Sequence, residues 1–422
     1  MAGALEGIKI LDFTEIIAGP LATMLLADMG AEVIKIEPPW GDPWRFSREF
    51  IPGESHTYIS LNRGKRSLPL DLTRTEGREV VEKLVLDADV VVVNYRPDVP
   101  AKLGIDYEAL AKLNPRIIYC ENTAFGRRGP HSSRPGYDLI IQAMSGIVAS
   151  EGKIVDGVPQ HVVSSALADF ATGIAMAWGI SAALYSRERT GEGQKIETTL
   201  LATALLLQTS RFLQVDAEDL STRTEVLADL EKMRAKGRPF SEVHSRVEEA
   251  RGRPPGNIYY RNYQTSDGVL AVGCLSDTLR RKLADVLSIE DIRFNPGYDP
   301  TTAEARRFGQ ELMIRVESLF RSRTMSDWIQ TLDNAGIPCG PVRFIEELID
   351  DDQVQANDLV VELEHVLAGS LRMVGPILRM TETPLRAKTA SPALGQHTDE
   401  IFRELGYEED EIERFRSSGI TR

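Results

Sequence analysis

Short apolar runs alternate with amphipathic segments through the first half of the chain, and this rhythm constrains the fold more than any other feature. The apolar runs predict β-strands at residues 7–13, 31–37, 89–95 and 116–126. The segments between them predict α-helices at residues 20–30, 74–88 and 107–114. Alternation of this kind indicates a mostly parallel sheet covered by helices. The predicted fold class is therefore α/β, and ligands are expected where the strands end.

The remainder of the chain changes character twice. Residues 209–253 are highly charged and helical in pattern, which is typical of a linker with surface helices. Residues 254–333 predict a small α/β domain, with two strands on either side of a turn. Residues 334–422 begin at a Gly- and Pro-rich joint, continue as short strands and end in a charged helix. We predict that this last segment returns to the large domain that residues 1–208 begin.

Charge and hydropathy limit the partners. The 422-residue chain has a net charge of −14. A nucleic-acid-binding protein needs a basic surface to neutralise phosphates, so this charge argues against that class. The most apolar run, residues 173–184, is too short and too rich in Ala and Gly for a membrane span and suits a buried helix better. We therefore expect neither nucleic acid nor a membrane as a partner, and the first residues do not resemble a signal peptide.

The cysteines and histidines argue against a metal site. Cys120, Cys274 and Cys339 are far apart and odd in number, which fits a reducing cytoplasm and no disulfide framework. The six histidines lack the spacing of a zinc site. The G-x-S-x-G motif of a serine hydrolase is also absent from the sequence. The predicted location is the cytoplasm, and no metal is expected.

Two basic stretches are candidates for phosphate binding. "NRGKRS" (62–67) carries three cations in what we interpret as a loop, either solvated or in contact with phosphates. "NYRPDVPAKLG" (94–104) follows a predicted buried strand. In this second stretch Tyr95 is suited to stack on a base, while Arg96 and Lys102 are suited to meet phosphates.

One acid stands out in the middle of the chain. Asp169 is the only charged residue of "SSALADFATGIAMAWG" (164–179). One interpretation is a helix N-cap, which stabilises a helix by about 1 kcal/mol. The other is a nucleophile, because a carboxylate at the mouth of an apolar helix is poorly hydrated. The residues alone favour the cap.

Ten segments spread over nearly the whole chain share one further property. They are "LDFTEIIAGPLATMLLADMGAEVIKIEPPWGDPWR", "SLNRGKRSLPLDL", "VVVNYRPDVPAKLGIDYEAL", "NPRIIYC", "FGRRGP", "RPGYDLIIQAMSG", "ADFATG", "LYSRERTGEGQKIETTLL", "GIPCGPV" and "LGQHTDEIFRELGY". In this order they resemble the family III CoA-transferases, the group that contains formyl-CoA transferase and carnitine CoA-transferase.

The resemblance implies a fold and an assembly. Members of that family have a Rossmann-like large domain made from both chain ends, with a smaller α/β domain inserted between them. They form homodimers in which each chain is a ring threaded through the other. The predicted order of large domain, linker, small domain and return fits this plan.

The resemblance also implies an activity and a role for Asp169. Family members exchange CoA between an acyl-CoA and a carboxylic acid, and hold no permanently bound cofactor. The aspartate of the motif that matches "ADFATG" attacks the acyl-CoA thioester, which favours the nucleophile interpretation of Asp169. A mixed anhydride and an aspartyl-CoA thioester are the implied intermediates.

Substrate contacts are carried over residue by residue, and some family residues are missing. Ile17 stands where the family has an active-site Gln, and Pro38 stands where it has an Arg. "GRPPGN" (252–257) replaces a run of glycines. These differences disfavour a formyl-CoA and oxalate pair and favour a larger or less polar acyl group. The resemblance assigns substrate or CoA contacts to Ile17, Leu72, Asn94, Tyr95, Arg96, Lys102, Tyr137 and Asp138.

Two alternatives stay open. An α-methylacyl-CoA racemase shares the fold but carries a His where this chain has Tyr137, and a Tyr of ordinary pKa is a poor base for an α-proton. A non-catalytic CoA-binding protein is the other alternative, and the presence of Asp169 argues against it.

Overall fold

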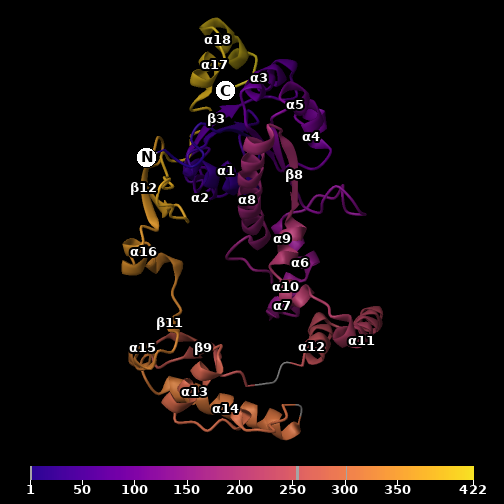
Figure 1. Cartoon of the computed structure of the whole chain (residues 1–422), viewed down its shortest axis with the longest axis vertical. Helices are drawn as coiled ribbons and strands as arrows, with labels where there is room; N and C mark the ends of the chain where they lie inside the picture. Colours follow the sequence, from indigo (N-terminus) through magenta and orange to yellow (C-terminus); the bar gives the residue numbers. More distant parts are fainter. Residues whose placement is uncertain (1, 253–255, 301) are drawn as a thin grey trace. The chain divides into compact units, whose positions relative to one another are not determined.

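The structure is a computed structural model that describes residues 2–252, 256–300 and 302–422 (Figure 1). Residues 253–255 of the loop singled out above therefore lie outside the described residues. The chain divides into two compact units, one made of Met1–Leu220 with Asp352–Arg422 and the other of Ser221–Asp351. Both chain ends thus belong to the first unit. The boundaries at residues 208, 253 and 333 stay predictions.

A six-stranded sheet forms the centre of the first unit, with the strand order β3-β2-β1-β4-β5-β8. Every neighbouring pair in it is parallel, so the predicted parallel sheet is confirmed. This order is that of the doubly wound nucleotide-binding fold, in which ligands bind where the order reverses, here between β1 and β4. The strands are β1 Lys9–Asp12, β2 Glu32–Glu37, β3 Lys65–Pro69, β4 Val90–Val93, β5 Ile118–Thr123 and β8 Gln194–Thr199.

Helices cover both faces of this sheet because successive strand side chains point to opposite sides. Val90 and Val92 pack with α1 (Ala18–Asp28) and α8 (Leu167–Thr190). Val91 and Val93 pack with the helices of the other face, which include two from the C-terminal end of the chain. That second layer is α3 Thr75–Leu86, α5 Tyr107–Leu113, α17 Thr398–Glu404 and α18 Glu409–Ser417. The return of the chain to the large sheet, predicted from sequence, is thus seen in the core packing.

Shorter elements complete the two units. The second unit contains an antiparallel sheet of order β11-β10-β9, as predicted for the strands on either side of the turn at 266–268. Its elements are most of α11 Asp216–Ala235, then α12 Phe240–Ala250, β9 Tyr260–Gln264, β10 Val269–Gly273, α13 Asp277–Val286, α14 Ala303–Arg321, α15 Met325–Asn334 and β11 Cys339–Pro341. The first unit also holds α2 His56–Ile59, α4 Val99–Leu103, α6 Asp138–Ser145, α7 Ile147–Glu151, β6 Ile154–Val155, β7 Val158–Pro159, α9 Leu200–Leu206, α10 Thr209–Phe212, α16 Asp352–Ala356, β12 Val360–His365 and β13 Gly369–Val374.

The basic stretch 62–67 corrects the sequence analysis. It is not a loop that is solvated or binds phosphate, because β3 begins at Lys65 and all three cations are paired inside the protein. Arg63 donates to Asp28 at 2.6 Å, and Lys65 donates to Asp12 at 2.9 Å, with all four side chains buried. Arg66 pairs with Glu404. Only the tertiary structure brings these distant acids to the cations.

Strand β8 was missed because its sequence carries no apolar run. Residues 194–199 read QKIETT, and the strand pairs only with β5 at the edge of the sheet. An edge strand has one neighbour and one partly solvated side, so polar side chains are tolerated there.

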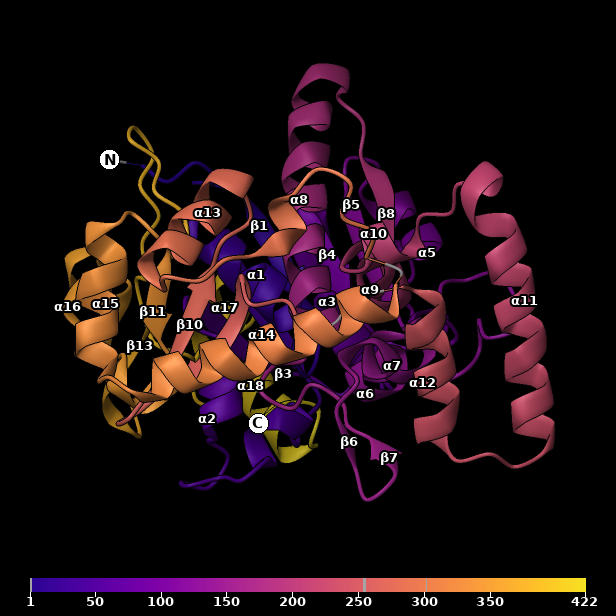
Figure 2. The ribbon, with the colours of Figure 1, turned by 90° about the horizontal axis from the view of Figure 1, so that it is seen from below.

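Helix α8 has the length and composition of a membrane span. Over the described residues it is the one helix that passes this test, with a mean hydropathy of 1.4 in its most apolar window. One such helix is a weak indication, since the core helix of a soluble protein passes the same test. Here α8 packs beside α1 on the sheet, as both views show (Figures 1 and 2).

Candidate active site

Asp169 lies in the first turn of α8 and does not cap it. The N-cap position is Ala166, which makes no side-chain capping bond. The capping group comes instead from Asp138, at the start of α6: its Oδ1 accepts hydrogen bonds from the backbone N–H of Ala168 at 2.8 Å and of Asp169 at 3.4 Å. The capping interpretation of Asp169 is therefore wrong. Asp138 satisfies the helix start and leaves the Asp169 carboxylate available.

A close approach of two helices fixes the place of Asp169. Gly173, one turn further along α8, faces the N-terminus of α1, and a Cβ on it would lie 2.7 Å from the Ala18 carbonyl oxygen. A larger residue would push the helices apart. The glycine of "ADFATG" thus holds the start of α8 against the turn that joins β1 to α1.

That turn is itself unusual. Ile16 has a φ of 72°, a left-handed conformation that is rare for a β-branched residue. Asn94, just after β4, holds the turn by two side-chain hydrogen bonds to Glu15, the residue before Ile16. It donates to the Glu15 carbonyl at 2.7 Å and accepts from the Glu15 N–H at 2.9 Å. Strain of this kind is often found at functional sites. Here it turns Ile16 toward the same cavity as Asp169.

The Asp169 cavity lies at the carboxyl ends of β1, β4 and β5, next to the reversal of strand order. Its volume is about 90 Å³, which is small beside the several hundred Å³ of a typical cofactor pocket. A cavity of this size has room for a small group and not for a whole cofactor. Its walls are formed by Ile16, Asn94, Tyr95, Arg96, Pro97, Asn122, Thr123, Ala124, Phe125, Ser132, Arg134, Pro135, Gly136, Tyr137, Asp169 and Leu200.

The structure brings five of the predicted site residues together in this wall: Asn94, Tyr95, Arg96, Tyr137 and Asp169. Asp138 lies directly behind Asp169 as the helix cap, and it also accepts a hydrogen bond from the buried Gln142. The described cavity wall contains no histidine, which is the residue that a racemase would place beside Asp138.

Three predicted residues lie outside the described wall. Ile17 packs in the core beside α1, while its neighbour Ile16 lines the cavity. Leu72 is buried in the core between the sheet and α3. Lys102 is exposed on α4 and pairs with Asp98 at 2.6 Å. Their assignment as CoA contacts stays a prediction.

Sequence reasoning missed several residues of the wall. One is Arg134, which comes from the segment between β5 and α6 and whose guanidinium lies 5.9 Å from the centre of the Phe125 ring. Asn122 and Thr123 end β5. The only available signal was their position after a strand, because nothing in the residue types distinguishes them from an ordinary loop.

The environment of Asp169 changes its acidity. Burial, followed by the negative charge of Asp138, raises the pKa of Asp169 to about 7. No ion pair or side-chain hydrogen bond to its carboxylate is found among the described residues. A carboxylate with these properties is more basic and less hydrated than an ordinary aspartate, and both effects increase its reactivity toward a carbonyl carbon.

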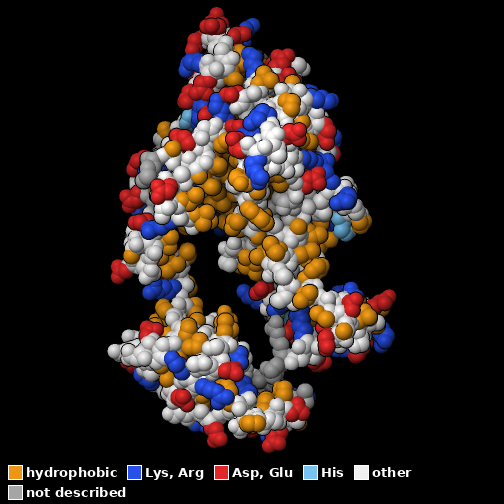
Figure 3. Space-filling view, viewed as in Figure 1, with side chains coloured by type: hydrophobic (Ala, Val, Ile, Leu, Met, Phe, Trp, Pro, Cys, Tyr) orange, Lys and Arg blue, Asp and Glu red, His pale blue; other side chains and the backbone are white. Residues whose placement is uncertain are grey.

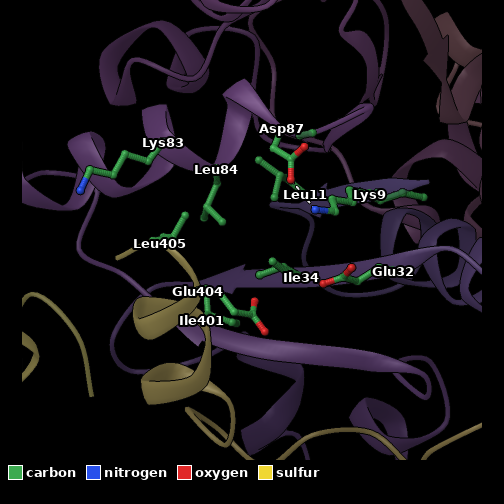
Figure 4. A pocket seen from close by; sticks show the side chains of 12 residues that line it. Lys9, Leu11, Glu32, Ile34, Lys83, Leu84, Asp87, Ile401, Glu404 and Leu405 are labelled. Atoms are coloured by element: carbon green, nitrogen blue, oxygen red, sulfur yellow. Dashed lines mark hydrogen bonds and ion pairs between the residues drawn. The ribbon is translucent and has the colours of Figure 1, made fainter. Parts of the chain in front are cut away.

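A larger cavity lies at the opposite edge of the sheet and has different chemistry. It has a volume of about 330 Å³ and is bordered by the amino ends of β1 and β2 and by α3 and α17 (Figure 4). Lys9 pairs there with Asp87, Glu32 and Glu404 pair with Arg66, and the Lys83 ammonium lies over the Tyr407 ring at 3.7 Å. The Asp169 cavity is the candidate active site, because it lies at the carboxyl ends of the strands and contains a carboxylate without a partner among the described residues.

Comparison with known proteins identifies the family to which the chain belongs. Residues 5–398 match CoA-transferase family III, and the chain belongs to that family. It is 32% identical to the succinyl-CoA:glutarate CoA-transferase of Mus musculus, covering 99% of this chain and 90% of the mouse protein. It is 35% identical to the succinate–glutarate CoA-transferase of Agrobacterium fabrum, covering 95% of each. The structure of a CAIB/BAIF family protein from Brucella suis superposes with a TM-score of 0.72 at 29% identity, covering 96% of this chain and all of that one.

Proposed function

We propose that this CoA-transferase moves CoA from an acyl-CoA donor to a carboxylic acid acceptor through covalent intermediates on Asp169. The observation that carries the proposal is the Asp169 carboxylate: it faces a cavity, has no partner among the described residues, and its pKa is raised to about 7 by burial and by Asp138. Polar groups kept for stability are normally hydrogen-bonded or paired.

The chemistry proceeds by exchange of acyl bonds. An Asp169 oxygen attacks the thioester carbon, the carbon–sulfur bond breaks, and the CoA thiolate leaves with its electron pair. The product is a mixed anhydride. The thiolate then attacks the Asp169 carbonyl carbon, which forms an aspartyl-CoA thioester and releases the donor acid. The acceptor carboxylate repeats both steps in reverse, so the sequence balances without a redox change or a bound cofactor.

The neighbours of Asp169 have separate roles in this proposal. Asp138 fixes the start of α8 and, with burial, keeps Asp169 basic. The small cavity limits the water that would hydrolyse an anhydride. Tyr95 and Arg96 line the cavity, and with the exposed Lys102 they would contact the CoA that extends out of it. The mouse and Agrobacterium relatives are named for succinate and glutarate, which supports a short acid as the substrate.

The proposal includes an interlocked homodimer. Phe170, Ile174 and Trp178 follow one another at helical spacing on α8 and are 38%, 51% and 73% exposed. Figure 3 shows hydrophobic side chains gathered over the region of α8 and α9. A contiguous apolar surface of this kind normally meets another protein surface, and the family relation argues for a second copy of this chain.

Subunit exchange tests the assembly. Tagged and untagged dimers mixed after folding should form no mixed dimer, whereas unfolding and refolding them together should. Trp178→Glu should reduce dimer formation in analytical ultracentrifugation, with the exposed Trp40→Glu as the control. A folded wild-type monomer at micromolar concentration would contradict the proposal.

A cytoplasmic location is proposed as well, supported by three free thiols.

Covalent trapping tests the mechanism. Wild-type protein incubated with acyl-CoA and no acceptor should carry CoA on the peptide that contains Asp169, detected by mass spectrometry and released by hydroxylamine. Asp169→Asn should carry none, and its transfer rate should fall by at least about a thousandfold while it stays folded. Near-normal turnover by verified Asp169→Asn protein would overturn the proposal.

A further inference from the structure

The wall of the Asp169 cavity carries a cation with no assigned role. Arg134 comes from the segment between β5 and α6 and shares the cavity with Asp169. No carboxylate lies within ion-pair distance of it among the described residues. Among the described residues, the one polar contact of its side chain joins Nη1 to Nδ1 of His131 at 3.3 Å.

Two other arginines near the cavity differ from Arg134, because each has a carboxylate close by. Arg127 donates two hydrogen bonds to the Glu121 carboxylate, both at 2.6 Å. Arg96, the other cation of the wall, lies 3.9 Å from Asp98. Arg134 is exposed and rests against Phe125, with its guanidinium left for an external anion.

A ligand in this cavity meets a reactive carboxylate, Asp169, and the Arg134 guanidinium, which is unpaired among the described residues. The pKa of Asp169 is raised by burial and by Asp138, whereas a cation that stabilised its anion would lower it. A cavity of about 90 Å³ holds only a short molecule between the two side chains. A guanidinium binds a carboxylate through two parallel hydrogen bonds, which fixes both its charge and its orientation.

We propose that Arg134 binds the second carboxylate of a short dicarboxylic acid whose first carboxylate reacts at Asp169. This inference rests on the transferase mechanism proposed above and names its substrate class. The sequence analysis favours a larger or less polar acyl group. The present inference agrees with the larger size, but it gives the acyl group a charge at its far end. Arg134 is a specificity residue, because it touches the substrate away from the reacting atoms.

Acceptor discrimination provides the test. In a ping-pong reaction the kcat/KM of the acceptor is independent of the donor, so glutarate and valerate are compared with one acyl-CoA. Wild-type protein should prefer glutarate, the dicarboxylate. Arg134→Gln should reduce the ratio of the two kcat/KM values by roughly 10- to 100-fold, mainly through the KM of glutarate, and Arg134→Lys should restore part of it. Arg128→Gln, an exposed arginine outside the cavity wall, should leave the ratio unchanged.

A binding measurement separates this inference from the mechanism. Glutarate should raise the melting temperature of Asp169→Asn protein, and the rise should be lost in the Asp169→Asn, Arg134→Gln double variant. If Asp169→Asn turns over normally but both Arg134 effects appear, the covalent mechanism fails and the substrate class stands. An unchanged ratio in active Arg134→Gln protein, or a wild-type preference for valerate, would overturn the inference.

Discussion

Two groups of buried charges in the first unit show opposite designs. The first group lies on β1, β2 and β3 and in the loop after β2. There Lys65 pairs with Asp12 at 2.9 Å and Lys35 pairs with Asp42 at 3.1 Å, and all four side chains are fully buried. Beside them Arg45 holds two more buried acids, Glu37 and Glu54. In the cavity at the start of α8, Asp169 has a carboxylate neighbour behind it and no cation paired with it.

The pKa values follow this difference. Burial alone would raise the pKa of Asp12, but Lys65 and Lys35 hold it well below its usual range. Burial also raises the pKa of Asp169, and there Asp138 adds to the rise, which brings it to about 7. The paired charges therefore favour the folded state, whereas the Asp169 anion, the proposed nucleophile, is disfavoured in it. The following predictions separate these two roles.

The largest stability effect should come from the paired group. Arg45→Met leaves Glu37 and Glu54 buried without their cation, and removal of one partner from a buried ion pair costs about 3–5 kcal/mol. Chemical denaturation should show a fall of that size in the free energy of unfolding. Arg66→Met, which loses pairs with half-exposed acids, should cost roughly 1 kcal/mol or less. Equal losses of stability in the two variants would show that burial of an ion pair does not determine its contribution.

The second prediction is a pH dependence of transfer. In the proposed mechanism the attacking group is the Asp169 anion, and its pKa of about 7 means that protonation removes the anion as the pH falls. The kcat/KM for acyl-CoA should fall roughly tenfold per pH unit below about pH 6.5. Asp138→Asn removes the charge that is the second cause of the shift and should move the midpoint to lower pH. A flat profile between pH 5 and 8 would contradict the raised pKa.

The third prediction concerns the stability of Asp169→Asn. The folded pKa of about 7 lies above the unfolded value near 4, so the folded state retains the proton longer. The contribution of Asp169 to the free energy of unfolding is then full below about pH 4 and is lost as the pH rises through 7. Asp169→Asn does not titrate, and at pH 8 it should be more stable than wild type by roughly 1–2 kcal/mol, discounted for partial exposure. A variant that is less stable at pH 8 would place Asp169 with the paired group.

The smallest effect should come from the exposed cations near the cavity. Arg96→Ala and Lys102→Ala should each raise the KM for acyl-CoA more than they lower kcat. The loss in kcat/KM should correspond to about 1 kcal/mol for each variant, because both side chains are more than half exposed. Lys112→Ala on α5 is the control. If neither variant changes the KM, the nucleotide end of CoA binds elsewhere.

The sequence alone determined the α/β class of the large sheet and four of its six strands, and it singled out Asp169 as a candidate nucleophile. Apolar runs such as VVVV in β4 and the helical periodicity between them depend on local composition, so they are readable without coordinates. Sequence patterns did not predict the structure where strand pairing or ion pairing decides it. β8 has no apolar run, and the cations of residues 62–67 read as solvated until their acids come within reach.

Only the tertiary structure decided what Asp169 does at its helix. The sequence could not distinguish a cap from a nucleophile, because the competing cap, Asp138, is thirty-one residues away and reaches α8 only after folding. Ile16 and Arg134 likewise share a cavity with Asp169 only in the folded protein. Ile16 is placed there by the packing of α1 against α8, and Arg134 by the loop after β5. Residue type is a local property, whereas hydration, pairing and pKa depend on neighbours that the fold supplies.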